Sequence, residues 1–442
     1  MSQQKYSLMK YTWPIFIELL LQMLVGNIDQ LMISMDSQTG VAAVGNANQI
    51  MNLLVMLLST ISLAMSILVT QYFGSKQYEK ISITYTVSLI SNTLFAFVIA
   101  IVLIFGIDII YGFMQVPLEV LADAKTYLII MAFGLPIQAL YTTYVTMFRT
   151  QGWMKQTMLM STFVNVLNVI GNACLIFGIG PFPALHVAGV AISSVFARVI
   201  GFILLAVIFN KNSEIKLRIP TKEQKPIKQF MKILHIGIPS ASESVSYDFS
   251  QIVIMKVING FGTKVINTKI YASVFATFSW VYASSISSAS QIITGFLMGA
   301  KQYDDTHKEV MKAMWISVVT SGLIALSMYL VSDSLFVIFT SDVEVLELGK
   351  KILFIEIFLE IGRAVNMTLV RCLQATGDVK YPVYLGVVFM WGVATLGSFI
   401  FGNVLGLGLV GVWIAMALDE CIRAVLLMIR WMKKEWMKRQ LV

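Results

Sequence analysis

Long apolar runs separated by short polar segments extend along the whole chain. Two clear examples are "LVMLLSTISLAMSILVT" (53–69) and "LFAFVIAIVLIFGIDIIYGF" (94–113). A helix needs about 20 apolar residues to cross the hydrocarbon core of a bilayer. We therefore predict an all-α polytopic membrane protein with twelve transmembrane helices. The predicted spans are 12–35, 47–71, 86–107, 127–148, 158–180, 187–209, 233–258, 270–298, 313–331, 352–370, 383–402 and 407–429.

One polar loop occurs twice in nearly the same form. "GSKQYEK" begins at position 74 and "GAKQYDD" begins at position 299, which is 225 residues later. Near the end of each half, "AGVAI" (188–192) and "VGVWI" (410–414) are 222 residues apart. Aligning the two halves there therefore requires a three-residue gap. Repeats of this kind predict two parallel six-helix units. The offset of 225 also relates Pro14 to Pro239, Glu18 to Glu243, Gly152 to Gly377 and Lys155 to Lys380.

The repeat divides the chain into two predicted lobes. The first lobe, residues 1–209, holds helices 1–6, and the second lobe, residues 231–442, holds helices 7–12. The basic, proline-containing segment 210–230 reads as a cytoplasmic linker. In secondary transporters built from repeats, substrate sites lie between the halves and one half rocks against the other. This organisation favours a transporter over a receptor or a membrane enzyme.

Composition and charge agree with a membrane protein. The chain is 57% hydrophobic and 13% charged, with a mean hydropathy of +0.78. The net charge of +8 is unevenly distributed, because most of the 32 Lys and Arg residues fall on the side that holds both termini. Cytoplasmic loops are the ones rich in Lys and Arg. We therefore expect both termini in the cytoplasm and no binding of nucleic acid. The other side carries only Lys125, Lys256, Lys264, Lys269, Lys350 and Lys351.

Ionisable side chains inside a span usually face a cavity, a partner or a transport pathway. In the first half, Glu18 and Asp29 share one face of helix 1, and Asp29 lies near the middle of the apolar run. They are candidates for a cation site or a proton acceptor, or they are paired structurally with another helix. Asn168 and Asn172 form a stripe on helix 5 that lines the same site or joins helices by hydrogen bonds.

The second half contains a denser set of acids. Glu243 and Asp248 lie at the start of helix 7, within a serine-rich stretch. Glu356, Glu360 and Arg363 share one face of helix 10, where Glu360 and Arg363 have the spacing of an ion pair. Two acids beside one guanidinium could hold a coupling proton or cation. A similar cluster on helix 12, with an equal chance of being structural, consists of Asp419, Glu420 and Arg423.

The prolines, the cysteines and the lack of enzyme or metal motifs limit the possible functions further. Pro14 and Pro239 lie within spans, where proline removes a helix hydrogen bond, so they are candidate bending points or static kinks. The three cysteines lie in apolar segments, and we expect no disulfide. The chain has no phosphate-binding loop, and its three histidines lack metal-ligand spacing. We therefore expect neither an enzyme nor a metal site, apart from Na⁺ at the acids named above, and no cofactor other than a coupling ion.

Several motifs resemble those of the multidrug and toxic compound extrusion (MATE) transporters of bacteria. They are "NIDQLMIS", "VAAVGNANQI", "VTQYFGSKQYEK", "ITGFLMGAKQYDD", "FRTQGWMK", "LVRCLQATGDVKYP" and "GLVGVWIAMALDECIRAVLLMIRW". The resemblance implies two six-helix lobes around a V-shaped cleft. It also implies that Asp29 belongs to a cation site in the first lobe and that helix 1 bends at Pro14. Many bacterial relatives carry an acid where this chain has Asn172. This difference makes Glu243, Glu356 and Glu360 of the second lobe stronger candidates for the coupling site.

These observations predict a secondary active antiporter in the plasma membrane. We expect it to export organic, often cationic, amphiphiles and drugs through the lipid bilayer in exchange for H⁺ or Na⁺, and to act as a monomer. The alternative is a flippase for lipid-linked saccharides or another lipid precursor, from the wider superfamily. Such flippases typically have more helices or a strongly cationic cavity, whereas acids are prominent inside the spans of this chain.

Overall fold

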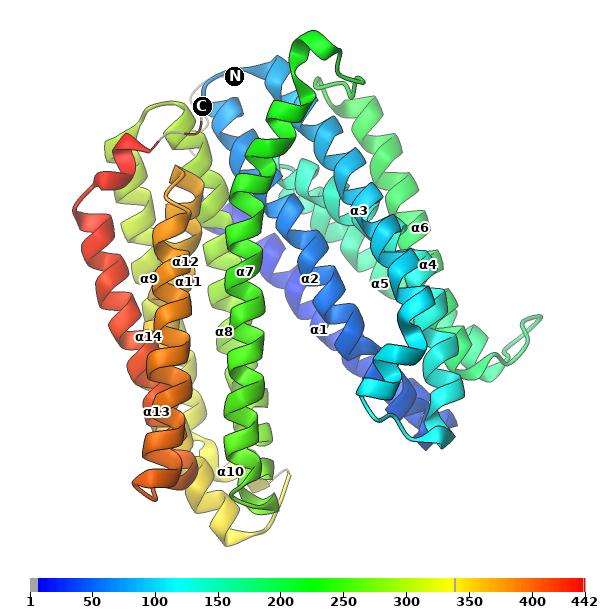
Figure 1. Cartoon of the computed structure of the whole chain (residues 1–442), viewed down its shortest axis with the longest axis vertical. Helices are drawn as coiled ribbons and strands as arrows, with labels where there is room; N and C mark the ends of the chain where they lie inside the picture. Colours follow the sequence, from blue (N-terminus) through cyan, green and yellow to red (C-terminus); the bar gives the residue numbers. More distant parts are fainter. Residues whose placement is uncertain (1–6, 338, 440, 442) are drawn as a thin grey trace. The chain divides into compact units, whose positions relative to one another are not determined.

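A computed structural model describes residues 7–337, 339–439 and 441 (Figure 1). Every regular element in this part of the chain is a helix. The all-α class predicted from the apolar runs is therefore confirmed. Lys5 and the two chain ends, on which part of the topology prediction rests, lie outside the described residues.

The chain folds into two compact units. The N-unit comprises Ile17–Gly237, and the C-unit comprises Ile238–Val442 together with the start of the chain up to Phe16. Both boundaries fall inside long helices, α1 (Leu8–Asp36) and α7 (Pro226–Asn259). Pro14 and Pro239 lie within these two helices, each two residues or fewer from a boundary.

The N-unit is a bundle organised around one central helix. Helix α4 packs against three neighbours, and α5 packs against α6. Fully buried alanines such as Ala43, Ala47 and Ala132 let the backbones approach closely in the core. The helices after α1 are α2 (Gln38–Gly74), α3 (Tyr78–Phe113), α4 (Leu118–Thr150), α5 (Met154–Phe177) and α6 (His186–Asn212), and the short helix η1 (Lys222–Gln224) precedes α7.

The C-unit is organised in the same way around α11 (Val343–Thr376). This helix packs against α8 (Thr263–Gly299), α9 (Tyr303–Leu330) and α14 (Gly408–Met432). Short helix α10 (Ser332–Val337) precedes α11. The remaining elements are α12 (Lys380–Phe389), η2 (Met390–Thr395), α13 (Leu396–Phe399), η3 (Ile400–Val404) and η4 (Glu435–Lys438).

The predicted span 383–402 is not a simple α-helix. Elements α12, η2, α13 and η3 follow one another without interruption, and η2 and η3 are π-helical. A π turn is rare and leaves backbone groups without their usual α-helical partners. Two hydroxyl groups donate to the Met390 carbonyl, Thr395 Oγ1 at 2.8 Å and Ser250 Oγ at 3.3 Å. Nothing in the local sequence predicts this feature.

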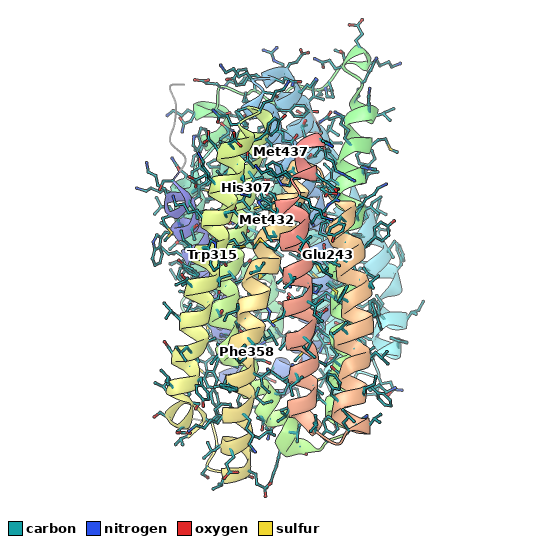
Figure 2. The ribbon with its side chains drawn as sticks, turned by 90° about the vertical axis from the view of Figure 1, so that its left-hand side faces the viewer. Glu243, His307, Trp315, Phe358, Met432 and Met437 are labelled. Carbon is teal, nitrogen blue, oxygen red and sulfur yellow. The ribbon has the colours of Figure 1, made fainter. Side chains whose placement is uncertain are left out.

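The twelve predicted spans correspond to long helical segments in the described part of the chain. Eight of these helices are both long and apolar enough to be recognised as membrane spans by composition alone. The other four, α7, α8, α11 and α14, carry the polar side chains described below. Large apolar side chains such as Trp315 and Phe358 are 58% and 51% exposed and lie on the outer surface (Figure 2).

The internal repeat extends to the backbone. Helices α2 and α8 end at the matched glycines Gly74 and Gly299. The left-handed residue that follows is not glycine but lysine, since Lys76 and Lys301 both have a φ of 58°. The two halves also differ in the loop near this gap, because eight residues (178–185) connect α5 to α6 whereas three (405–407) connect η3 to α14.

Candidate functional site

Asp29 on α1 is held by two amides of α5. Asn172 Nδ2 donates to Asp29 Oδ1 at 2.6 Å. The hydrogen-bond network orients the Asn168 amide so that its nitrogen donates to the same oxygen at 3.1 Å and its oxygen accepts from the Ser194 hydroxyl. The structure thus brings together three residues that the sequence singled out. The asparagine at position 172, where the resemblance implied a second acid, supplies a donor to Asp29.

Arg198 of α6 is partly buried and acts on this group only at longer range. Its guanidinium attracts negative charge on Asp29 and on Tyr127, but within the described part of the chain it forms no ion pair with Asp29. The direct partners of Asp29 are therefore the two amides of α5.

Glu18, although on the same helix as Asp29, belongs to a different contact. It is only 2% exposed, and its Oε2 accepts a hydrogen bond from Arg149 Nη2 on α4 at 2.6 Å. Of the two acids of α1, Glu18 is thus paired with an arginine, whereas Asp29 is held by amides. Glu18 has the structural pairing that the sequence left open as one of two alternatives.

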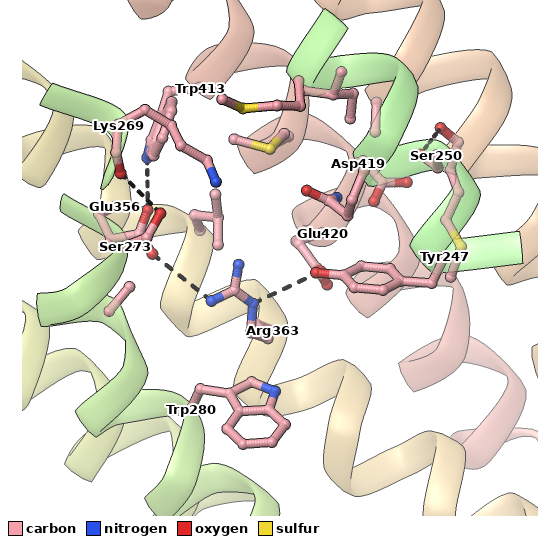
Figure 3. Close-up of a pocket in the computed structure, with 18 of the residues that line it drawn as sticks. Tyr247, Ser250, Lys269, Ser273, Trp280, Glu356, Arg363, Trp413, Asp419 and Glu420 are labelled. Atoms are coloured by element: carbon pink, nitrogen blue, oxygen red, sulfur yellow. Dashed lines mark hydrogen bonds and ion pairs between the residues drawn. The ribbon is translucent and has the colours of Figure 1, made fainter. Parts of the chain in front are cut away.

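The C-unit contains a cavity of about 190 Å³ whose lining is unusually rich in charge. Helices α7, α8, α11 and α14 and the π segment η2 contribute to its wall. Figure 3 shows charged side chains converging on this space from several of these elements. Those that line it are Lys269, Glu356, Arg363, Asp419 and Glu420.

Arg363 is at the centre of one half of this cluster. It forms an ion pair with Glu360, one turn earlier on α11, as the spacing predicted. Its Nη1 also lies 3.7 Å from Glu356 Oε1, and its Nε lies 3.9 Å from Glu420 Oε1. Glu360 is fully buried and accepts a further hydrogen bond from the Ser279 hydroxyl at 2.5 Å.

Glu356 is the most loosely held of these acids. Its Oε2 accepts a hydrogen bond from the indole of Trp413 on α14 at 2.7 Å. Its Oε1 lies 3.7 Å from Arg363 Nη1, beyond ordinary hydrogen-bond distance. Glu356 also lines the cavity. A carboxylate with one weakly engaged oxygen beside open space can accept a proton or bind a cation.

Arg423 is at the centre of the other half of the cluster, on α14. It binds Asp419 through two hydrogen bonds, of 3.1 Å from Nε and 2.6 Å from Nη2, and it lies 3.0 Å from Glu420. Asn366 of α11 donates to Glu420 Oε2 at 2.5 Å and thereby joins the two helices. The acids of α11 and α14, which the sequence analysis described as two separate clusters on helices 10 and 12, form one network.

The two acids predicted on helix 7 are not part of the cavity lining. Glu243 on α7 (Figure 2) accepts a long hydrogen bond of 3.4 Å from Gln374 Nε2 on α11. Asp248 lies on an exposed face of the same helix. Neighbouring residues Tyr247 and Ser250 do face the cavity.

Trp413 and Lys269, which the sequence analysis did not single out, line the cavity as well. Neither has a sequence signal that distinguishes it from an ordinary core tryptophan or a loop-side lysine.

Comparison with known proteins places this arrangement in a family. The model of the MatE family matches residues 14–174 and 239–400, once in each half of the chain. An uncharacterized transporter, YisQ of Bacillus subtilis (strain 168), is 34% identical over 438 residues, which cover 99% of this chain and 96% of YisQ. A probable multidrug resistance protein, NorM of Thermotoga maritima, is 23% identical over 98% of this chain and 93% of its own.

A solved structure shares the fold. A mutant of the Vibrio cholerae MATE transporter VcmN superposes with a TM-score of 0.90 at 18% identity, covering 98% of both chains. The family model and the 34% identity to YisQ confirm the family predicted from the motifs, and with it a transporter rather than an enzyme.

Proposed function

Because the chain belongs to the MATE family of membrane transporters, we propose that it is a secondary active efflux antiporter. It exports organic, often cationic, amphiphiles and drugs in exchange for H⁺ or Na⁺. Relatives named as probable multidrug resistance proteins support the substrate class. No cofactor beyond the coupling ion is required by this proposal.

The charge balance of the C-unit network carries the proposal. Two guanidiniums, those of Arg363 and Arg423, form the ion pairs of four buried carboxylates, which are Glu356, Glu360, Asp419 and Glu420. Lys269 adds a third positive charge at the cavity wall, which leaves the acids in surplus by one. Burying an unpaired charge is costly, so a surplus of acids in such a place favours uptake of protons or of a cation. The loosely held carboxylate of Glu356, which borders the cavity, is the first candidate to receive it.

The N-unit offers a contrast. Asp29 has amide donors and, at longer range, the guanidinium of Arg198, and Glu18 has Arg149. Glu18 is therefore paired with a cation of the protein itself, and Asp29 is held by amide donors. We accordingly assign the coupling ion to the C-unit network and a structural role to Glu18. Asp29 is assigned a secondary role at most.

Coupling follows from competition for the same carboxylates. A coupling ion bound at Glu356 reduces the negative charge of the cavity and so weakens its attraction for a cationic substrate. Release of that ion on the other side of the membrane restores the charge. An exchange of this kind requires only that ion and substrate differ in affinity between the inward- and outward-facing states. We propose that rocking of one six-helix lobe against the other connects these states.

The proposal includes location and assembly. The excess of Lys and Arg on one side supports a plasma-membrane protein with both termini in the cytoplasm. Each unit has its own core and its own buried charge network. One chain is thus sufficient for the site, and we propose that it acts as a monomer.

Transport in everted membrane vesicles tests the proposal. Uptake of a fluorescent organic cation is measured under a pH gradient and, separately, under a Na⁺ gradient. We expect one gradient to drive uptake by the wild type, Glu356→Gln to abolish the coupling, and Asp29→Asn to retain most of it. Glu243→Gln serves as a matched C-unit control, since Glu243 does not line the cavity. If neither gradient drives uptake, the antiport proposal fails. If Asp29→Asn alone abolishes coupling, the assignment to the C-unit fails.

A further inference from the structure

Lys269 of α8 is a half-buried lysine that lines the charged cavity of the C-unit. Figure 3 draws its side chain reaching into the same space as Arg363 and Trp413. Within the described part of the chain no carboxylate comes within ion-pairing distance of its ammonium group. The antiport mechanism does not use this group either. A cation inside a cavity that already binds cations requires an explanation.

A second lysine of the same helix provides the comparison. Lys264, five residues earlier, has an exposed side chain and pairs with two acids, Asp342 at 3.0 Å and Glu344 at 2.8 Å. Acids are therefore available at this end of the helix, and Lys264 uses them. Lys269 instead turns its ammonium group toward the cavity, where its partner is not supplied by the protein.

The cavity contains separate surfaces for two charges and an apolar group. Lys269 and Trp280 lie eleven residues apart on α8, which corresponds to about 16 Å along a helix. The apolar and aromatic side chains of Met390, Met416 and Trp413 line the same cavity. The carboxylate of Glu356 borders the same space. Tyr247 and Trp280 also line the cavity and are 37% and 45% exposed, so it is not sealed.

Resting on the proposed efflux function, we infer that this cavity selects zwitterionic amphiphiles over purely cationic ones. The carboxylate or phosphate of the substrate binds the Lys269 ammonium, its cationic group lies at the surplus carboxylates, and its aromatic body lies against Trp413 and the methionines. Charge-assisted hydrogen bonds of this kind are among the stronger polar contacts. The protein supplies Lys269 with no anionic partner, so the anionic group of such a substrate has no competitor for it within the cavity wall.

The test uses two dyes that differ in one group. Rhodamine 110 carries a free carboxylate and a cationic ring system, and rhodamine 123 is its methyl ester and is only cationic. Binding to the purified full-length protein in detergent is measured by fluorescence anisotropy. We expect the wild type to bind rhodamine 110 more tightly than rhodamine 123. Lys269→Met should weaken binding of rhodamine 110 about tenfold or more, since one hydrogen bond to a charged group is lost, and should leave rhodamine 123 unchanged or tighter.

Two further variants complete the design. Lys264→Met removes a lysine of the same helix that faces the surface, and it should leave the preference between the dyes intact. Lys269→Arg keeps the positive charge and should retain the preference for rhodamine 110, which separates loss of charge from a folding defect in Lys269→Met. The inference is overturned if the wild type binds the ester as tightly as the acid. It is also overturned if Lys269→Met and Lys264→Met change the preference equally.

Failure of this inference is distinguishable from failure of the proposed function. Binding in detergent requires no ion gradient, so a protein that prefers rhodamine 110 but transports neither dye under either gradient contradicts only antiport. A protein that is driven by a gradient but shows the same preference in Lys269→Met as in the wild type contradicts only the role of Lys269.

Discussion

Arg149 donates a hydrogen bond to Glu18 across 2.6 Å and so ties α4 to α1 inside the N-unit. The Glu18 side chain is 2% exposed and that of Arg149 is 23% exposed. Removing one partner of a buried ion pair leaves an uncompensated charge, which costs about 3–5 kcal/mol, whereas removing both is much less harmful. We expect Arg149→Met to lower the free energy of unfolding by about 3 kcal/mol, near the lower end of that range because Arg149 is partly exposed.

A double-mutant cycle measures this coupling. The variants Arg149→Met, Glu18→Gln and the double variant are unfolded thermally in detergent, and the double variant should lose less stability than the sum of the two single ones. Additive losses would show that the two side chains do not interact.

Asp378 is fully buried just after the end of α11 and is held by two arginines. Arg430 Nε of α14 donates to it at 2.8 Å, and Arg439 lies 3.3 Å away. Asp378→Leu would leave Arg430 without its buried partner, so we expect a loss of about 3–5 kcal/mol in the free energy of unfolding.

The control for Asp378 is the other acid that pairs with Arg430. The Glu435 side chain is 47% exposed, so Glu435→Gln should change stability by about 0.5 kcal/mol or less. Thermal unfolding of both variants in detergent gives the comparison. Equal losses would contradict the central role assigned to Asp378.

Gly362 lets α11 approach α14 beside the acid network. A Cβ at this position would lie 2.8 Å from the Glu420 carbonyl carbon and 2.9 Å from the Cys421 nitrogen. Gly362→Ala should therefore push the helices apart and cost about 1–3 kcal/mol, the range for overpacking. It should also reduce transport, because Glu420 belongs to the network around Arg363.

Gly392 provides the matched control for Gly362. A Cβ there would meet nothing within 4 Å, so Gly392→Ala should retain both thermal stability and transport. The thermal midpoint in detergent and dye uptake in vesicles are measured for the two variants. Equal behaviour of both would contradict the close approach of α11 to α14.

Asp342 gives a pH dependence outside the membrane-spanning segments. It begins α11 by accepting a hydrogen bond from the Glu344 backbone at 3.0 Å, and the Lys264 ammonium that donates to it lowers the pKa of its carboxyl group. A carboxyl group with a lowered pKa in the folded state stabilises the fold above its unfolded pKa, which is about 3.9. That stabilisation is lost as the pH falls through the folded pKa.

The thermal midpoint of the wild type should thus fall more than that of Asp342→Asn between about pH 6 and pH 3. Lys264→Met should behave like Asp342→Asn, since the donor is absent. Parallel curves for all three proteins would show that the contact contributes nothing to stability.

Helix periodicity was sufficient to predict contacts within one helix. Glu360 and Arg363 pair as their spacing indicated, because residues three apart lie side by side on any α-helix. The partners on other helices were not predictable from spacing. Arg149 reaches Glu18 across 131 positions and Trp413 reaches Glu356 across 57, and such contacts depend on how the helices pack.

The substitution of Asn172 for an acid also had a meaning that only the structure supplied. The sequence indicated that a second acid was missing from the first lobe. The structure adds that the amide donates to Asp29 and that Arg198 acts on it only at longer range. The repeat, by contrast, was visible in the sequence, and the structure adds that its matched lysines, Lys76 and Lys301, share one backbone conformation.

The π segments η2 and η3 place extra residues in the span formed by α12, η2, α13 and η3. Each π turn contains one more residue than an α turn of similar length, and η2 contributes Met390 and Ala394 to the wall of the cavity. Conversion of one such turn to α geometry would rotate the helix beyond it by about 100° and shift it by about 1.5 Å, the step of one residue. The part of the cavity wall that belongs to this span would thereby move by the step of one residue, while the span stays in the bilayer.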